Sequence, residues 1–317
     1  MINKQHRLRH MLVLLFLLAI SSFAGLARSA AQTSPKYVVA FAQDTMANDW
    51  RIAQVRQMAE AFAAYPEVKF IYSDGKGRSA RQIQDIENFV YQKVDVLLAS
   101  PSDSLAATPV ISKAYRAGIP VVMVSRSIAS EDYTSFVAPD NYRIGFDAAT
   151  YMASKLQGRG RIVMLSGIPT SSTAQERSKG FRDALRDYPD MQLVADKVAN
   201  YLRADAIRAV EELVTTGVEF EGIYAQSDSM ATGARLALNK AGIDPRDKLI
   251  VGIDYIAEAR EAIRSGEQAA SFLYPTSARE AAQLVMKILR GEAVPKRVMV
   301  DSVRITTDNV EIVAPIF

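Results

Sequence analysis

The sequence predicts an α/β protein of two similar lobes, each a doubly wound parallel sheet, joined by a hinge. Apolar runs such as "YVVAFA" at 37–42 and "VDVLLAS" at 94–100 lack the polar alternation of a half-exposed strand, and segments with helical periodicity separate them. The same succession begins again after residue 160. Because strands buried on both faces need helices on both faces, this pattern indicates two layered units in one chain.

Strands and helices follow one another in the same order in both halves. A typical helix stripe is formed by Ile52, Val55, Ala59 and Phe62. In the first half we expect strands at 37–42, 69–74, 94–100 and 121–125, and helices near 52–62, 83–90 and 105–118. In the second half we expect strands at 161–167, 192–198, 222–226 and 249–254, and helices at 176–185, 206–217 and 231–242.

Three short repeats also relate the two halves. Each first copy recurs 123 to 125 residues later, and a near-constant offset favours two copies of one fold. The pairs are "YPEV" at Tyr65 with "YPDM" at Tyr188, "SDS" at Ser102 and Ser227, and "AGI" at Ala117 and Ala241. We expect an N-terminal lobe of residues 36–139 plus 276–302 and a C-terminal lobe of residues 140–275 plus 303–317.

Residues 1–31 are typical of a secretory signal peptide. Three basic residues precede the apolar run "MLVLLFLLAI", and small residues follow it in "ARSAAQ". We therefore expect export to the periplasm. Removing the segment's four basic residues leaves 34 of the 38 basic residues against 35 acidic ones, so the remainder has no basic surplus for nucleic acid.

The exported part contains no histidine and no cysteine. Both histidines, His6 and His10, lie in the predicted signal peptide, and the chain has no cysteine at all. This excludes Ser-His-Asp and Cys-His catalysis, Cys/His zinc sites and disulfides. We expect no catalytic residue, metal or cofactor. A secreted hydrolase that uses only carboxylates, such as Asp44 and Asp254, stays an alternative.

Polar and aromatic residues follow the predicted strands, where ligands of parallel sheets bind. Carboxylates, amides and guanidinium groups suit sugar hydroxyls, and an aromatic ring such as that of Trp50 covers the apolar face of a sugar. Asn48 or Asp49 also fits a helix cap, as does Asp228, and a solvated position is the default for Arg177. The residues concerned are Asp44, Asn48, Trp50, Arg51, Ser125 and Arg126, then Arg177, Tyr201, Ser227, Asp228, Asp254 and Tyr274.

Six segments resemble the periplasmic sugar-binding proteins of ABC importers, with the type I fold, in the ribose- and galactofuranose-binding group. They are "FAQDTMANDWRIAQ", "GIPVVMVSRSI", "VAPDN", "QERSKGF", "YAQSDSMATGA" and "VGID", and the similarity runs from 36 to 309. The resemblance implies first-lobe contacts from Asn48, Trp50, Arg51 and Arg126. It implies a hinge-edge aspartate at Asp140, second-lobe contacts from Arg177, Tyr201 and Asp254, and Tyr274 where the family often has Gln.

The predicted ligand-binding set departs from the family at two places. Ser125 stands where the family usually has Asp, and Ser227 where it commonly has Asn. Fewer hydroxyl partners leave a furanose, a deoxy sugar, a polyol and an anionic sugar derivative all open. The full predicted set is Asp44, Asn48, Trp50, Arg51, Ser125, Arg126, Asp140, Arg177, Tyr201, Ser227, Asp254 and Tyr274.

The resemblance also implies partners. The ligand is a small sugar-like molecule, captured when the hinge closes, and the closed form is recognised by the membrane permease of an ABC importer. The alternative partner that recognises the closed form is a sensor, either a histidine kinase or a chemoreceptor. We expect a monomer and no nucleic-acid partner.

Overall fold

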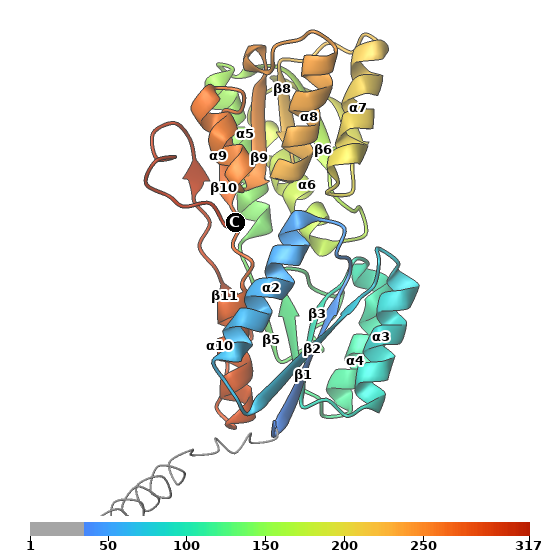
Figure 1. The fold of residues 1–317 in the computed structure, drawn as a ribbon. Helices are drawn as coiled ribbons and strands as arrows, with labels where there is room; N and C mark the ends of the chain where they lie inside the picture. The colour runs from blue at the N-terminus through green and yellow to red at the C-terminus, as the bar shows by residue number, and fades with distance from the viewer. Residues whose placement is uncertain (1–34) are drawn as a thin grey trace, which may run out of the picture. The chain divides into compact units, whose positions relative to one another are not determined.

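Residues 35–317 are described by a computed structural model; the predicted signal peptide, residues 1–31, lies outside this part. The described chain forms two α/β lobes, each around a six-stranded sheet (Figure 1). Strands of the first sheet are β1 (Tyr37–Gln43), β2 (Val68–Asp74), β3 (Val96–Ser100), β4 (Val121–Val124), β5 (Ser135–Ala138) and β11 (Arg297–Met299). Those of the second are β6 (Arg159–Ser166), β7 (Asp190–Val198), β8 (Gly222–Ala225), β9 (Leu249–Asp254), β10 (Ala270–Leu273) and β12 (Arg304–Ile305).

Both sheets have the strand order of a doubly wound fold. The first sheet runs β11-β5-β4-β3-β1-β2 with every pair parallel, and the second runs β12-β10-β9-β8-β6-β7. In the second sheet only the short edge pair of β10 and β12 is antiparallel. The predicted fold class is confirmed.

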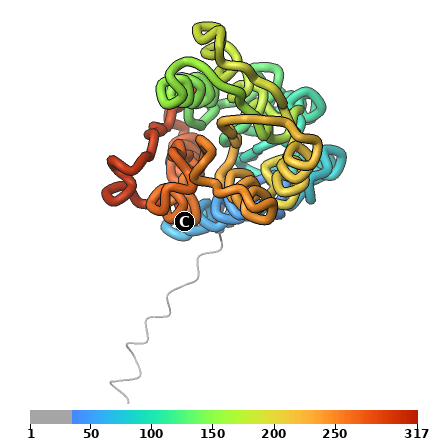
Figure 2. Tube along the Cα trace, turned by 90° about the horizontal axis from the view of Figure 1, so that it is seen from above, coloured from blue at the N-terminus to red at the C-terminus, as the bar shows by residue number. Residues whose placement is uncertain are grey.

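Helices cover both faces of each sheet. On the first sheet, α3 (Ser79–Tyr91) and α4 (Ser104–Arg116) cover one face, and α2 (Asp49–Ala63) and α10 (Ala278–Leu289) cover the other. On the second sheet, α5 (Asn141–Lys155) and α6 (Ser172–Leu185) cover one face, and α7 (Arg203–Thr215) and α8 (Asp228–Lys240) cover the other. Figure 2 shows the molecule from above. The short α9 (Ala257–Ser265) packs beside α8, and a 3₁₀ turn spans Pro245–Asp247.

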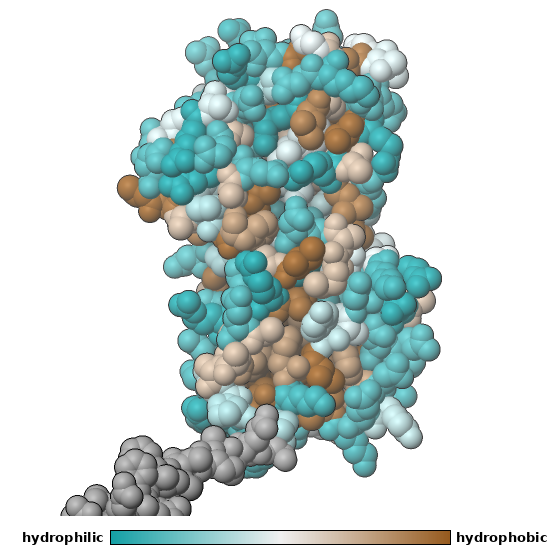
Figure 3. All heavy atoms as spheres, in the orientation of Figure 1, coloured by the Kyte–Doolittle hydropathy of each residue, from teal (hydrophilic) through white to brown (hydrophobic). Residues whose placement is uncertain are grey.

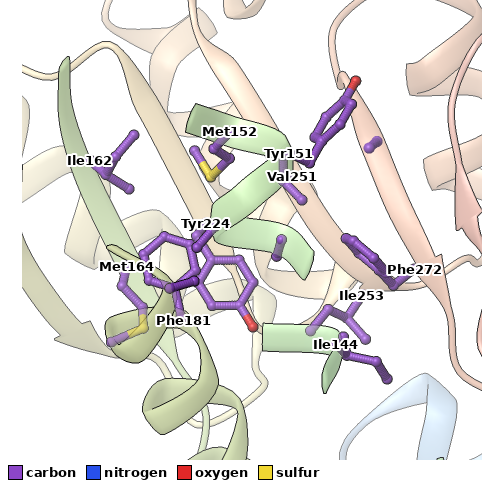
Figure 4. Close-up of a cluster of buried hydrophobic side chains, with 14 of the residues drawn as sticks. Ile144, Tyr151, Met152, Ile162, Met164, Phe181, Tyr224, Val251, Ile253 and Phe272 are labelled. Carbon is purple, nitrogen blue, oxygen red and sulfur yellow. The ribbon is translucent and has the colours of Figure 1, made fainter. Parts of the chain in front are cut away.

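The core of the second lobe fixes where α6 lies. In the cluster of Figure 4, the rings of Phe181 and Tyr224 stack with centroids 4.3 Å apart. Gly145 of α5 and Gly180 of α6 allow the two helices to approach closely. A Cβ at Gly180 would lie 2.0 Å from the carbonyl oxygen of Tyr142, and one at Gly145 would lie 2.1 Å from that of Arg177. This close packing of α5 against α6 fixes the position of Arg177 beside the second sheet.

The chain passes between the sheets three times, at residues 139–140, 274–277 and 300–303. The exact lobe boundaries given above stay a prediction. In the view of Figure 3, hydrophobic side chains are interspersed with hydrophilic ones. None of the helices within residues 35–317 has the length and apolar content that crossing a membrane requires.

Candidate ligand-binding site

A cavity with about 470 Å³ of empty space, part of it open to solvent, lies between loops that follow the strands of both sheets. This is the location that parallel α/β sheets favour for ligands. Eleven of the twelve predicted residues line it, and Asp140 does not. The lining residues are Asp44, Thr45, Asn48, Trp50, Arg51, Ser125, Arg126, Ile168, Thr173, Arg177, Asn200, Tyr201, Leu202, Ser227, Asp254 and Tyr274.

On the first-lobe side, one carboxylate holds two guanidinium groups. Asp44 Oδ2 accepts a hydrogen bond from Arg126 Nη1 at 2.6 Å, and Asp44 Oδ1 lies 3.3 Å from Arg51 Nε. All three side chains are buried. Burial, followed by the nearby charge of Arg126, lowers the pKa of Arg51 to about 10. The cluster stays compact because Asp44 lies between the two cations.

Small hydroxyl groups complete the position of Arg51. Its Nη1 donates to Ser100 Oγ at 3.0 Å and to Ser125 Oγ at 3.4 Å. Ser125 has a left-handed backbone, with φ of 59°, as the chain turns after β4. The side chain of Ser125 thus lies beside Arg51 in the lining of the cavity.

Asn48 serves mainly as a structural link. Its Oδ1 accepts hydrogen bonds from the backbone N–H groups of Trp50 and Arg51, which caps α2. Its Nδ2 donates to the carbonyl oxygen of Tyr201 in the second lobe at 2.6 Å. The predicted use of its amide to hold a ligand edge therefore competes with bonds made inside the protein. Ser227 is likewise a cap, and its Oγ accepts from Met230 N–H at the start of α8.

Three aromatic rings line the cavity. Trp50 is 5% exposed, and its Nε1 donates to the carbonyl oxygen of Tyr274 at 3.0 Å, with the two rings tilted by 49°. Tyr201 has φ of 62°, and its ring fills the space where a Cβ on Gly167 would lie. Gly167 is thus required for this placement of Tyr201.

Arg177 is buried, although the sequence favoured a solvated position for it. It is 2% exposed, its Nε donates to Asn141 Oδ1 at 3.0 Å, and its Nη1 donates to the carbonyl oxygen of Gln226 at 2.6 Å. Its guanidinium lies over the Tyr274 ring, 4.4 Å from the centroid. The second lobe therefore presents one guanidinium to the cavity, held by neutral oxygens.

Asp254 ends β9 with a strained backbone, φ of 118°, and its side chain is buried. Within residues 35–317, no side chain donates a hydrogen bond to its carboxylate. Burial raises the pKa of Asp254 well above its usual value, and the charge of Asp228 adds to this, while Arg177 opposes it. Its carboxylate is available to a ligand.

Asp228 supports the backbone next to Asp254, a role that the sequence did not reveal. Its Oδ2 accepts hydrogen bonds from Tyr255 N–H and Ser271 Oγ, both at 2.6 Å, and its Oδ1 accepts from Gln268 Nε2 at 2.7 Å. A Cβ at Gly252 would lie 1.9 Å from Asp228 Oδ1, so glycine gives this carboxylate its space. No local motif indicates this pairing, because it joins three separate elements.

Hydrogen bonds also join the loops of the two lobes around the cavity. Thr173 Oγ1 donates to the carbonyl oxygen of Ser125 at 3.0 Å, and Ser127 N–H donates to Ser172 Oγ at 2.9 Å. Ser104 N–H donates to the carbonyl oxygen of Thr170 at 2.9 Å. This segment at the start of α6 was not predicted, because its only sequence signal is a run of small hydroxyl residues.

Asp140 lies outside the cavity. Its side chain is exposed and caps α5 by accepting a hydrogen bond from Arg143 N–H at 2.9 Å. The predicted contact of Asp140 with a ligand thus finds no support in its position, although it does lie where the chain passes between the lobes. Residues 35–317 contain no group of three or more His, Cys, Asp or Glu side chains that could hold a metal ion.

Residues 39–293 match the periplasmic binding protein domain, and the chain belongs to this family. A ribose import binding protein of Bacillus subtilis is 29% identical over 268 residues, which cover 83% of this chain and 85% of that protein. A galactofuranose-binding protein of Escherichia coli is 27% identical, covering 89% of this chain and 91% of its own length.

A solved structure, the fructose-binding periplasmic domain of a hybrid two-component system, superposes with a TM-score of 0.83. It is 29% identical and covers 87% of this chain and 92% of that one. The predicted membership of the type I periplasmic binding proteins is confirmed.

Proposed function

We propose that the protein captures a sugar or sugar-like small molecule between its two lobes and delivers it to the membrane permease of an ABC importer. The observation that carries this proposal is the cavity itself. It combines an available carboxylate at Asp254, guanidinium donors and three aromatic rings between the two lobes. These groups complement the hydroxyls and the apolar face of a sugar. The names of the ribose and galactofuranose relatives support the same ligand class.

Capture proceeds in this proposal by closure about the three crossing segments. The lobes, residues 36–139 plus 276–302 and residues 140–275 plus 303–317, rotate toward one another. A ligand that contacts both lobes stabilises the closed state. The hydrogen bonds from Thr173 to Ser125 and from Asn48 to Tyr201 belong to that state. Export through the signal peptide, residues 1–31, brings the monomeric protein to the periplasm.

We favour ligand binding over the alternative function, a hydrolase that uses only carboxylates. Asp44, one member of the candidate pair, is held by Arg51 and Arg126 at 3.3 and 2.6 Å, so both of its oxygens already face cations of the same lobe. A carboxylate engaged in this way is not free to approach a glycosidic bond. Cleavage of a bound glycoside with release of sugar would contradict this reading.

Thermal unfolding against a panel of monosaccharides, polyols and sugar acids tests the proposed function. A ligand that binds only the folded state adds about 2.7 kcal/mol at a hundredfold excess over its Kd, so we expect a clear rise in Tm for one ligand. Asp254→Asn, which should bind about tenfold more weakly, should lose about half of this rise at the same ligand concentration. The matched change at the exposed Asp187 should keep it. No rise with any member of the panel would overturn sugar binding and leave only the fold.

A sensing role is the second candidate, favoured by the structural similarity to the periplasmic domain of a two-component system. Cells that lack the protein separate the two roles once the ligand is known. Loss of uptake of the labelled ligand indicates the importer. Unchanged uptake with loss of ligand-induced transcription indicates the sensor.

A further inference from the structure

The charges that line the cavity do not balance. Three arginines and two aspartates are its only charged lining residues among those described, which gives a formal charge of +1. All five are at most 6% exposed, so water screens this charge poorly. The five are Arg51, Arg126, Arg177, Asp44 and Asp254.

The surplus lies on the first-lobe side. Asp44 is the one carboxylate within 4 Å of Arg51 and Arg126, so this cluster retains one positive charge. In the described part of the chain, Arg177 makes no ion pair within 4 Å and donates to neutral oxygens. A buried charge without compensation is costly, and a bound anion relieves that cost.

Several guanidinium N–H donors at the cavity also have no hydrogen-bond partner within residues 35–317. Arg126 Nε is buried without a hydrogen-bond partner. The Nη2 groups of Arg51, Arg126 and Arg177 donate to no residue in the described chain. Guanidinium groups with free N–H donors match a carboxylate, which accepts two parallel bonds.

The backbone adds positive potential in the same place. Asn48 and Ser227, the N-caps of α2 and α8, line the cavity, and Thr173 lies in the first turn of α6. Three helices thus direct their N-terminal ends, which carry partial positive charge, at one small space.

We propose that the ligand is a sugar acid, a compact polyhydroxylated molecule with one carboxylate. Its carboxylate binds Arg51 and Arg126, and its hydroxyls donate to Asp254. The proposal rests on the sugar-binding function and names the class of sugar. Ser125 sets this preference, because its Oγ lies 3.4 Å from Arg51 Nη1 and adds no negative charge there.

Calorimetric titration of the purified protein with matched pairs tests the ligand class. The pairs are glucose and glucuronate, galactose and galacturonate, and arabinose and arabinonate, with acetate as a control for anion binding alone. We expect one acid to bind at least tenfold more tightly than its neutral partner, and acetate not to compete at equal concentration. A neutral sugar that binds as tightly as its acid would overturn the anionic class and leave sugar binding standing. No detectable binding in any of the pairs would overturn both the anionic class and sugar binding.

Two variants of nearly equal size test the role of Ser125. Ser125→Asp places a carboxylate beside Arg51 and balances the cavity, so we expect affinity for the acid to fall at least tenfold. Ser125→Asn adds similar bulk without charge and should keep the preference for the acid. Both residues tolerate the left-handed backbone at this position. Equal losses in the two variants would show that bulk, not charge, matters. If Ser125→Asp fails to fold, the matched pairs on the unchanged protein still decide the ligand class.

Discussion

Asp44 and Asp254 are two buried carboxylates in one cavity, and they differ in what surrounds them. Asp44 follows β1 and is held by Arg51 and Arg126, whereas Asp254 ends β9 without a side-chain donor in the described chain. The first carboxylate organises cations within its own lobe. The second is held ready for a ligand. The comparison shows how one residue type can give rigidity on one side of a cleft and binding capacity on the other.

The backbone around these two carboxylates differs in the same sense. Asp254 and the following Tyr255 have φ of 118° and 60°, conformations that cost free energy. Asp228 stabilises this turn by accepting the Tyr255 N–H. Asp44 does not have a positive φ, and its position relies on side-chain charge instead. The ligand-facing carboxylate thus needs a supporting residue from another element, Asp228 of α8.

The largest expected effect comes from removing the ion pairs of Asp44. Asp44→Asn removes the charge between Arg51 and Arg126 and leaves two buried guanidinium groups without compensation. We expect the free energy of unfolding to fall by about 3–5 kcal/mol, measured by urea denaturation without ligand. Asp254→Asn is the matched control in the same cavity and should cost far less. Equal losses in the two variants would contradict the division of roles between Asp44 and Asp254.

The stability of Asp254→Asn relative to the wild type should depend on pH. Because burial raises the folded pKa of Asp254 above its unfolded value, its protonation stabilises the ligand-free protein at low pH. That contribution is lost as pH rises through the folded pKa. We expect the variant to gain stability relative to the wild type between pH 4 and pH 8, as measured by urea denaturation at each pH. Ligand affinity should fall about tenfold at pH 7, because the amide offers one acceptor oxygen in place of two. A difference in stability that stays flat across this range would show that Asp254 does not titrate differently in the folded protein.

The fold was predictable because buried parallel strands leave a plain signal. All five residues of β3 are buried, and such unbroken apolar runs mark the central strands. The buried strand β5 was not predicted. Nor were the edge strands β11 and β12, of three and two residues. They are too short for a periodic pattern, and their pairing depends on the chain passing between the lobes.

The candidate site was predictable only as a set of strand-end residues. Topology brings Asp44, Arg126 and Asp254 to one cavity, since carboxyl ends of parallel strands share an edge. How each side chain is used depends on partners that local sequence does not reveal. Asn48 donates to Tyr201, and Asp228 accepts from Tyr255 and Gln268, through contacts that only the assembled lobes create.

The smallest expected effect concerns Asp140, which caps α5 outside the cavity. Asp140→Ala removes the hydrogen bond to Arg143 N–H and should lower the free energy of unfolding by about 1 kcal/mol. Ligand affinity should stay within about twofold, because the side chain is exposed and does not line the cavity. Asp140→Ser retains a capping oxygen without the charge and should recover most of the stability. A tenfold loss of affinity in Asp140→Ala that Asp140→Ser does not recover would place the Asp140 charge in ligand binding after all. It would also extend the comparison of Asp44 and Asp254 to a third aspartate, at the crossing between the lobes.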